Sequence, residues 1–416
     1  MISRRPVKPR WGTAAGAGVP LILAAALPVW PGLLWGGLQQ AAEQPTATPS
    51  DSWEWELPPW MPRPVVPQDN PMTQEKVELG RYLFYDQDLS ANRTQSCASC
   101  HVQELSFADP RPRALGSTGE VHPRGSMSLA NVAYASTLTW ANPNLTTLEQ
   151  QVLIPLFGED PVELGMGGKE DELLDRLRTS AIYPDLFAAA FPEEEDPIRL
   201  QTLVWALASF QRALVSVSSP YDRYLQGDDD AVGAEVLRGE DLFFSERLEC
   251  FHCHGGPFFS GSIDYEGKGF SEIEFFNNAL YNVDGQGAYP SENTGIYEFT
   301  LDPADMGRFR APSLKNIAVT APYMHDGSLA TLDDVLDHYE AGGRTIQHGP
   351  KAGSGRESPL RSEFIVGFEL TPKERGDLLA FLHALTDDHF LTDRRFSDPW
   401  PDEGRLTTLS EPRSNP

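Results

Sequence analysis

Cysteine is scarce in this chain, which has four among its 416 residues. None of them stands directly after the apolar stretch near the N-terminus, so the cysteine that a lipoprotein anchor requires there is missing. Lysine and arginine are also few, 33 against 60 aspartates and glutamates, and the formal net charge is −27. This balance argues against a nucleic-acid partner, because neutralising phosphates requires a basic face. Sustained alternation of apolar and polar residues is rare, which predicts a mainly α fold.

The four cysteines form two Cys-x-x-Cys-His motifs, one ending at His101 and the other at His254. In such a motif the two thiols add to the vinyl groups of a haem, and the histidine becomes the proximal ligand of its iron. The alternatives are a disulfide pair, a zinc knuckle or a thioredoxin-like redox pair. Zinc would need four convergent ligands, whereas the motifs lie about 150 residues apart and each has its own histidine. We therefore predict two covalent c-type haems, held through Cys97, Cys100 and His101 and through Cys250, Cys253 and His254.

The N-terminal residues have the pattern of a targeting segment. Four basic residues between Arg4 and Arg10 precede an apolar stretch from about Gly12 to Leu38. Residues 1–40 therefore read as a secretory signal peptide or an uncleaved N-terminal anchor, and prolines within the stretch weaken the anchor interpretation. Because haem is attached to these motifs outside the cytoplasm, we expect a periplasmic protein, with weak membrane anchoring if the stretch is retained.

The remaining length suits two domains of ordinary size. Leu79–Asp86 resembles Leu237–Phe244, and a haem motif follows each segment, so the sequence contains an internal repeat of a helix and a haem motif. We expect a Pro- and Trp-rich linker over residues 41–70 and a tail over residues 396–416. Between them we expect two cytochrome c-like haem domains with long loops, over residues 71–230 and 231–395. Apolar periodicity predicts helices from near Thr73 and over residues 170–178, 200–217, 331–339 and 373–385.

Further motifs surround the two haem motifs. Trp140, Leu148–Gln151, Ile154–Leu156 and Pro161–Met166 form one series, and Phe309–Ala318 with Thr320–Gly327 forms another. Together they resemble the two domain signatures of the bacterial dihaem cytochrome c peroxidase and MauG superfamily, from roughly Pro71 to Leu385. Ser106–Asp109 and Arg124–Asn131 look most like the MauG-like MbnH-type branch, whose substrate is a tryptophan on a partner protein.

The resemblance implies roles for three residues near the first haem. Glu163 matches the carboxylate over the distal face, which acts as acid and base in cleavage of the peroxide O–O bond. Pro155 matches the residue that walls this pocket without ligating iron, although two more residues separate it from Glu163 than the family pattern has. Trp140 matches the aromatic residue between the haems and would relay an electron. From the residues alone, Glu163 also fits a surface ion pair and Trp140 a core position.

The second haem differs from the peroxidase pattern. The family places its distal ligand fourteen residues after His325, which here is Tyr339. Peroxidases that accept electrons from small cytochromes have methionine there, whereas tyrosinate is a hard ligand that stabilises oxidised iron, as in MauG. In that branch the two haems share two oxidising equivalents as a bis-Fe(IV) state and oxidise residues of another protein. His338 is a rival ligand, and Tyr339 also fits a half-buried helix position.

Two more residues bear on the haems. His122 is the only histidine of residues 102–139, where peroxidases have a distal histidine that moves on activation, but it lies away from that position. We interpret it as a loop residue, which implies a first haem that is open at rest. The resemblance also implies that Arg310 pairs with a haem propionate, since a guanidinium suits a carboxylate.

The family binds one Ca²⁺ between its domains. Thr320 and Pro322 match the residues that supply main-chain carbonyl ligands. Gly125 occupies the position of the family's asparagine ligand, with Asn131 nearby. Because water can replace a protein ligand around calcium, we expect a Ca²⁺ site in spite of this departure.

The sequence thus predicts a periplasmic dihaem oxidoreductase that uses H2O2 to oxidise tryptophan or tyrosine residues of a partner protein. One alternative is a dihaem cytochrome c peroxidase that reduces H2O2 with electrons from a small cytochrome, against which Tyr339 argues. The other is a dihaem electron carrier or sensor without enzymatic activity, against which Glu163 argues.

Overall fold

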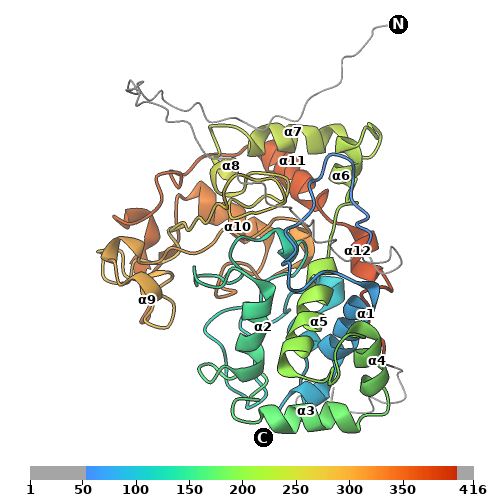
Figure 1. Ribbon diagram of the computed structural model, residues 1–416. Helices are drawn as coiled ribbons and strands as arrows, with labels where there is room; N and C mark the ends of the chain where they lie inside the picture. The colour runs from blue at the N-terminus through green and yellow to red at the C-terminus, as the bar shows by residue number, and fades with distance from the viewer. Residues whose placement is uncertain (1–52, 401–416) are drawn as a thin grey trace, which may run out of the picture. The chain divides into compact units, whose positions relative to one another are not determined.

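Residues 53–400 are described by a computed structural model, and helices dominate them. The only strands among these residues, β1 (Thr345–Ile346) and β2 (Gly353–Ser354), form one short antiparallel pair. The expectation of a mainly α fold is therefore confirmed. The helices are α1 (Gln74–Tyr85), α2 (Leu148–Phe157), α3 (Glu170–Thr179), α4 (Tyr183–Ala190), α5 (Leu200–Ala213), α6 (Pro220–Leu225), α7 (Ala234–Phe243), α8 (Cys250–Cys253), α9 (Tyr297–Thr300), α10 (Leu332–Glu340), α11 (Pro372–His383) and α12 (Asp388–Thr392), as labelled in Figure 1.

Local capping sets the start of several helices. The Thr73 side chain accepts a hydrogen bond from the backbone N–H of Lys76, which fixes the first turn of α1. Thr331 and Thr371 cap α10 and α11 in the same way, each in a capping box with an acidic residue three positions later. These helices therefore begin within two residues of the limits that periodicity predicts.

Helix α5 ends earlier than periodicity predicts. It stops at Ala213, four residues before the expected limit at 217. The reason is a tertiary contact with Asn131, whose side-chain oxygen accepts from the Ser216 N–H at 2.9 Å and whose amide donates to the Ser216 carbonyl at 3.0 Å. Because both backbone groups of Ser216 are taken by this amide, the chain leaves the helix in extended form.

Two main hydrophobic cores hold the described residues together. The first core lies among α1, α2, α3, α4 and α5, and the second among α6, α7, α10 and α11. After α11 the chain returns to the first core, because Phe390 and Phe396 pack there. The predicted linker reaches it from the other end: residues 53–70 have no regular secondary structure, and Trp53 and Trp55 pack against the same core.

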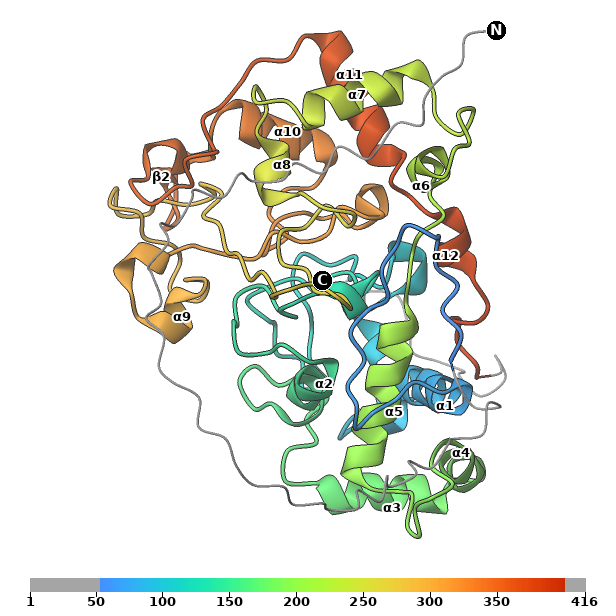
Figure 2. The same ribbon diagram turned by 45° about the horizontal axis from the view of Figure 1, so that its top comes forward.

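The predicted repeat appears as two equivalent helix crossings, α1 over α5 and α7 over α11 (Figure 2). A Cβ on Gly80 in α1 would lie 2.0 Å from the Ala206 carbonyl oxygen in α5. A Cβ on Gly239 in α7 would lie 2.1 Å from the Asp377 carbonyl oxygen in α11. Only glycine allows such a close approach of two backbones. The repeat therefore includes the partner helices α5 and α11, which sequence comparison missed.

A second repeated element follows each haem motif. The segments Ser128-Leu129-Ala130-Asn131 and Ser313-Leu314-Lys315-Asn316 each end in an asparagine with left-handed backbone, at φ 60° and 61°. The N–H of Asn131 donates to Leu214 just after α5, and the N–H of Asn316 donates to Leu385 just after α11. Each half of the repeat thus ties its second helix to the loop beside its haem motif by the same hydrogen bond.

Among residues 53–400, no helix is long and apolar enough to cross a membrane. The predicted signal or anchor over residues 1–40 lies outside the described residues, as does most of the predicted tail.

We predict that Gly80→Ala destabilises the protein by about 1–3 kcal/mol, because the new methyl group overlaps backbone that cannot move independently. Gly376→Ala is the matched control: it lies within α11, and a Cβ there meets no atom within 4 Å. It should stabilise the fold by about 0.5–1 kcal/mol, since alanine loses less conformational freedom than glycine in a helix. Thermal unfolding of the haem-loaded variants measures both effects, and equal stability of the two would contradict this account.

Candidate functional site

The first haem motif begins with a 3-10 turn over Cys97–Ser99. The next residue but one, His101, is fixed through its ring: Nδ1 lies 2.7 Å from the carbonyl oxygen of Phe107. Phe107 is fully buried and has a left-handed backbone with φ 58°, which turns its carbonyl back toward the histidine. Burial lowers the pKa of His101, so the ring is neutral. A neutral imidazole held at Nδ1 presents Nε2, as a metal ligand requires.

The second motif has the same arrangement on helix α8. His254 Nδ1 lies 3.1 Å from the carbonyl oxygens of both Phe259 and Pro312. Phe259 is again a buried residue with a left-handed backbone, at φ 54°. The pKa of His254 is lowered by burial, which keeps this ring neutral as well. The two carbonyl partners were not found from the sequence, where the only signal is a phenylalanine five or six residues after each histidine.

No disulfide links the four cysteines. Burial raises the pKa of Cys97 to about 12 and that of Cys100 to about 11, and the pKa values of Cys250 and Cys253 to about 12. Burial thus favours the protonated thiol at all four positions. Thiols beside a histidine that presents Nε2 fit the covalent attachment of a haem.

Glu163 lies close to the first motif, because its negative charge contributes to the raised pKa of both Cys97 and Cys100. Burial raises the pKa of Glu163 itself to about 7. Main-chain hydrogen bonds place this residue: the Ser117 N–H donates to the Glu163 carbonyl at 2.7 Å, and the Leu164 N–H donates to the carbonyl of Pro155 at 2.9 Å. Helix α2, which contains Pro155, is therefore tied to the loop that carries Glu163.

His122 lies beside this loop. It belongs to an irregular segment between the first motif and α2, and its Nε2 is 3.4 Å from the carbonyl oxygen of Val162. Burial lowers the pKa of His122, so its ring is neutral.

Tyr339 and His338 are consecutive residues of α10 but have different surroundings. The pKa of Tyr339 is raised, first by burial and then by the Cys253 and Cys250 thiols, which places its hydroxyl near the second motif. His338 Nε2 instead lies 2.9 Å from the carbonyl oxygen of Asn278, and burial lowers its pKa to about 4. The side chain of Asn278 also lies near Tyr339 and acts to lower its pKa. Sequence reasoning did not find Asn278.

Trp140 and Arg310 lie together in a cavity that also borders Gly125, Thr320 and Pro322. The Trp140 indole N–H donates to the Gly125 carbonyl at 2.8 Å, and the Arg310 backbone N–H donates to the Trp140 carbonyl at 2.8 Å. The residue predicted between the haems, the predicted propionate partner and the predicted calcium ligands therefore line one cavity.

The Arg310 guanidinium is buried, with 8% of the residue exposed, and burial lowers its pKa to about 10. It donates to the carbonyl of Thr139 and approaches the sulfur of Met127, and no carboxylate of the described residues pairs with it. Burying a charge without a counter-ion is costly, so this site calls for an anionic group. A haem propionate fits that requirement.

The side chain of Asn131 does not replace the missing calcium ligand. Both of its polar atoms are taken by Ser216, in the contact that ends α5. The calcium site stays a prediction that rests on Thr320 and Pro322.

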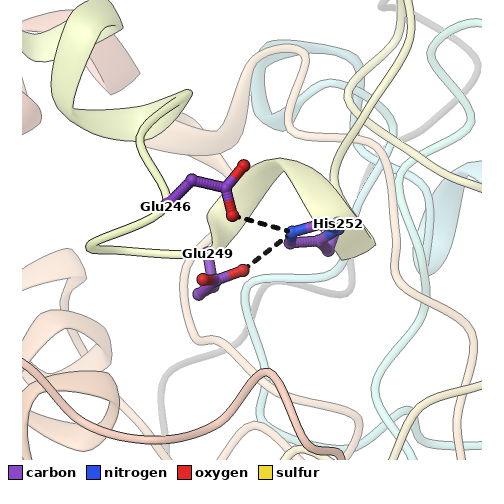
Figure 3. A group of neighbouring side chains, drawn as sticks. All are labelled: Glu246, Glu249 and His252. Atoms are coloured by element: carbon purple, nitrogen blue, oxygen red, sulfur yellow. Dashed lines mark ion pairs between the residues drawn. The ribbon is translucent and has the colours of Figure 1, made fainter. Parts of the chain in front are cut away.

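Among the described residues, one group of side chains has the composition of a metal site: Glu246, Glu249 and His252 (Figure 3). His252 Nε2 lies 2.7 Å from a Glu249 carboxylate oxygen and 3.9 Å from one of Glu246. The His252 ring also stacks on Phe364, with centroids 4.2 Å apart. The Glu246 side chain is 83% exposed, so we interpret these three residues as a surface ion pair. The pair orients His252, which lies between the two cysteines of the second motif.

Comparison with known proteins agrees with this geometry. The model of the di-haem cytochrome c peroxidase family matches residues 74–230. Cytochrome-c peroxidase IdrP1 of Denitromonas iodatirespirans is 33% identical over 82% of this chain and 90% of its own length. Methylamine utilization protein MauG of Methylorubrum extorquens is 34% identical over 77% of this chain and 80% of its own length.

A solved structure extends the likeness to the fold. It is that of a MauG-like protein associated with microbial copper homeostasis, with 51% sequence identity and a TM-score of 0.82. The match covers 84% of this chain and 100% of that protein. The chain therefore belongs to the di-haem cytochrome c peroxidase and MauG family.

Proposed function

We propose that this protein is a periplasmic dihaem oxidoreductase that uses H2O2 to oxidise tryptophan or tyrosine residues of a partner protein. The observation that carries the proposal is the contrast between its two motifs. The Glu163 carboxylate, with a pKa of about 7, lies beside the first motif, and the phenol of Tyr339 lies beside the second. The first arrangement suits reaction with peroxide, and the second suits storage of an oxidising equivalent.

The proposal requires two covalent c-type haems, one on Cys97, Cys100 and His101 and one on Cys250, Cys253 and His254. When bound, they would supply the redox chemistry that takes up the two oxidising equivalents of H2O2. The residues around the first motif would direct that chemistry. Glu163 would take a proton from the attacking peroxide oxygen and return it to the leaving oxygen, for which a pKa near the working pH is best. Pro155 has no side-chain donor atom, so it would leave this face accessible to peroxide.

Tyr339 would hold the second haem as a phenolate, a hard ligand that favours oxidised iron and makes a poor entry point for electrons from a cytochrome. His338 would support this ligand indirectly, because it contacts the Asn278 carbonyl. Trp140 would carry charge between the haems. Arg310 would neutralise a propionate.

The choice of partner draws on the solved MauG-like structure, whose title associates that protein with microbial copper homeostasis. With 51% identity over 84% of the chain, we extend the association to this protein and propose a periplasmic copper-handling protein as the partner. We also propose the periplasm as location, haem domains over residues 71–230 and 231–395, and a Ca²⁺ bound through the carbonyls of Thr320 and Pro322.

We predict one high-spin and one low-spin ferric haem in the resting protein, because Tyr339 would add a second protein ligand to the second haem and the proposal gives the first haem none. Electron paramagnetic resonance of Tyr339→Phe should show the low-spin signal converted. His338→Gln is the matched control on the same helix and should keep it. Loss of the low-spin signal in the histidine variant alone would assign the ligand to His338.

We predict that Glu163→Gln slows the reaction with H2O2 by about 10²–10⁴-fold, the usual contribution of a general acid/base. In the wild type, the rate should fall as the pH drops below about 7, since the protonated carboxyl cannot accept the proton of peroxide. Stopped-flow absorbance of the haems measures both. The variant should lack this pH limb, and a variant that reacts within about twofold of the wild type would remove Glu163 from the mechanism.

We predict that peroxide together with the cognate partner leaves a tryptophan or tyrosine of that partner heavier by one or more oxygens, or crosslinked. The experiment incubates the haem-loaded protein and H2O2 with periplasmic copper-binding proteins and maps their peptides by mass spectrometry. Glu163→Gln serves as the control that binds haem without activating peroxide. Rapid turnover with a reduced small cytochrome, without covalent change in any partner, would instead assign a cytochrome c peroxidase.

A further inference from the structure

A cluster of oxidisable aromatic rings lies next to Trp140. Tyr281 and Tyr289 belong to the same hydrophobic cluster, and they are 4% and 3% exposed. The His325 ring lies beside all three: its centroid is 6.5 Å from that of Trp140, 6.5 Å from that of Tyr281 and 6.3 Å from that of Tyr289. Because both distances run through the His325 ring, the ring centroid of Trp140 is at most twice 6.5 Å from that of either tyrosine. The site described above uses neither tyrosine.

The two tyrosines differ in the partner of the hydroxyl. Tyr281 donates to a carboxylate oxygen of Asp326, which is also buried. Tyr289 donates at 3.0 Å to the amide oxygen of Asn277. A carboxylate can take up a proton, whereas an amide oxygen cannot at neutral pH. Of these two tyrosines, only Tyr281 therefore has a base positioned to receive its phenolic proton.

The charges around Tyr281 favour loss of that proton together with an electron. Arg344 and Lys351 lie over its ring, with the guanidinium carbon 5.8 Å and the ammonium nitrogen 5.5 Å from the centroid. They oppose a positive charge on the ring, so removal of an electron alone is unfavourable. If the proton moves to Asp326 at the same time, the ring stays neutral and the repulsion does not arise.

We propose that Tyr281 is a redox-active tyrosine that receives one oxidising equivalent from the haem pair, through Trp140, when no partner protein supplies an electron. Tyr281 loses one electron to the oxidised haem pair and its phenolic proton to Asp326, which leaves a neutral tyrosyl radical and a protonated carboxyl. H2O2 is the terminal oxidant, and the second of its two equivalents stays on the haems. This inference rests on the proposed reaction with peroxide and adds a second oxidisable site to it.

The test is freeze-quench electron paramagnetic resonance of the haem-loaded full chain after addition of H2O2 without a partner. The wild type should give a tyrosyl signal that changes when the protein contains ring-deuterated tyrosine. Tyr281→Phe should abolish that signal and prolong the life of the oxidised haem spectrum. Asp326→Asn should also abolish it, although Tyr281 is still present, because the proton acceptor is gone.

Two control variants separate this site from other tyrosines. Tyr289→Phe keeps an aromatic ring in the same cluster and should keep the signal. Tyr183→Phe removes a phenol that also donates to a carboxylate, that of Asp86 at 2.6 Å, but in the first core and away from Trp140. It should keep the signal too. Haem absorbance and thermal unfolding of each variant verify that it is folded and loaded.

The outcomes are distinguishable. A signal that survives in Tyr281→Phe, or the absence of any tyrosyl signal while peroxide changes the haem spectrum, overturns this inference and leaves the proposed function standing. A haem spectrum that peroxide does not change overturns the proposed function, and the inference with it.

Discussion

Both candidate haem sites depend on a hydrogen bond from a histidine Nδ1 to the carbonyl oxygen of a buried phenylalanine, which at His254 is shared with the carbonyl of Pro312. Phe107 and Phe259 adopt left-handed backbone to provide that carbonyl, a conformation that is strained for a residue of this size. The surrounding core maintains it, since both rings are buried. The orientation of each histidine ring therefore depends on the packing of a neighbouring aromatic residue as well as on the histidine's own position in its motif.

The two halves share this frame and differ in what faces the haem. The repeated helix crossings at Gly80 and Gly239 give each half the same scaffold. On it, the first half carries the Glu163 carboxylate, whose pKa burial raises to about 7, and the second half carries the phenol of Tyr339. Lys315 marks a further asymmetry: it forms a buried ion pair with Asp222, whereas the equivalent position of the first half is Ala130. A duplicated scaffold can thus support two different haem environments through changes at single positions.

Much of this could be predicted from the sequence, because the chemistry is concentrated in local patterns. The Cys-x-x-Cys-His motifs, the helix limits set by threonine caps, and the mainly α fold are all properties of short segments. The carbonyl partners of the histidines, the early end of α5 at Asn131 and the place of Asn278 beside Tyr339 were not predictable. The last two depend on contact between residues far apart in the chain, and the carbonyl oxygen that holds each histidine has no signature in a sequence. The roles of Glu163, Pro155 and Tyr339 stay predictions.

The packing of Phe390 and Phe396 in the first core determines whether the two halves of the protein can be separated. Phe390 and Phe396 fill positions among α1 and α5, and the Gln103 amide donates to the carbonyl of Asp393. A fragment limited to the first haem motif and its helices would lack these side chains and expose the apolar surface that they cover. The two halves are built on one repeat, but Phe390 and Phe396, which follow the second half's helices, complete the core of the first half. We therefore expect the two halves to fold as one cooperative unit and not as separable single-haem modules.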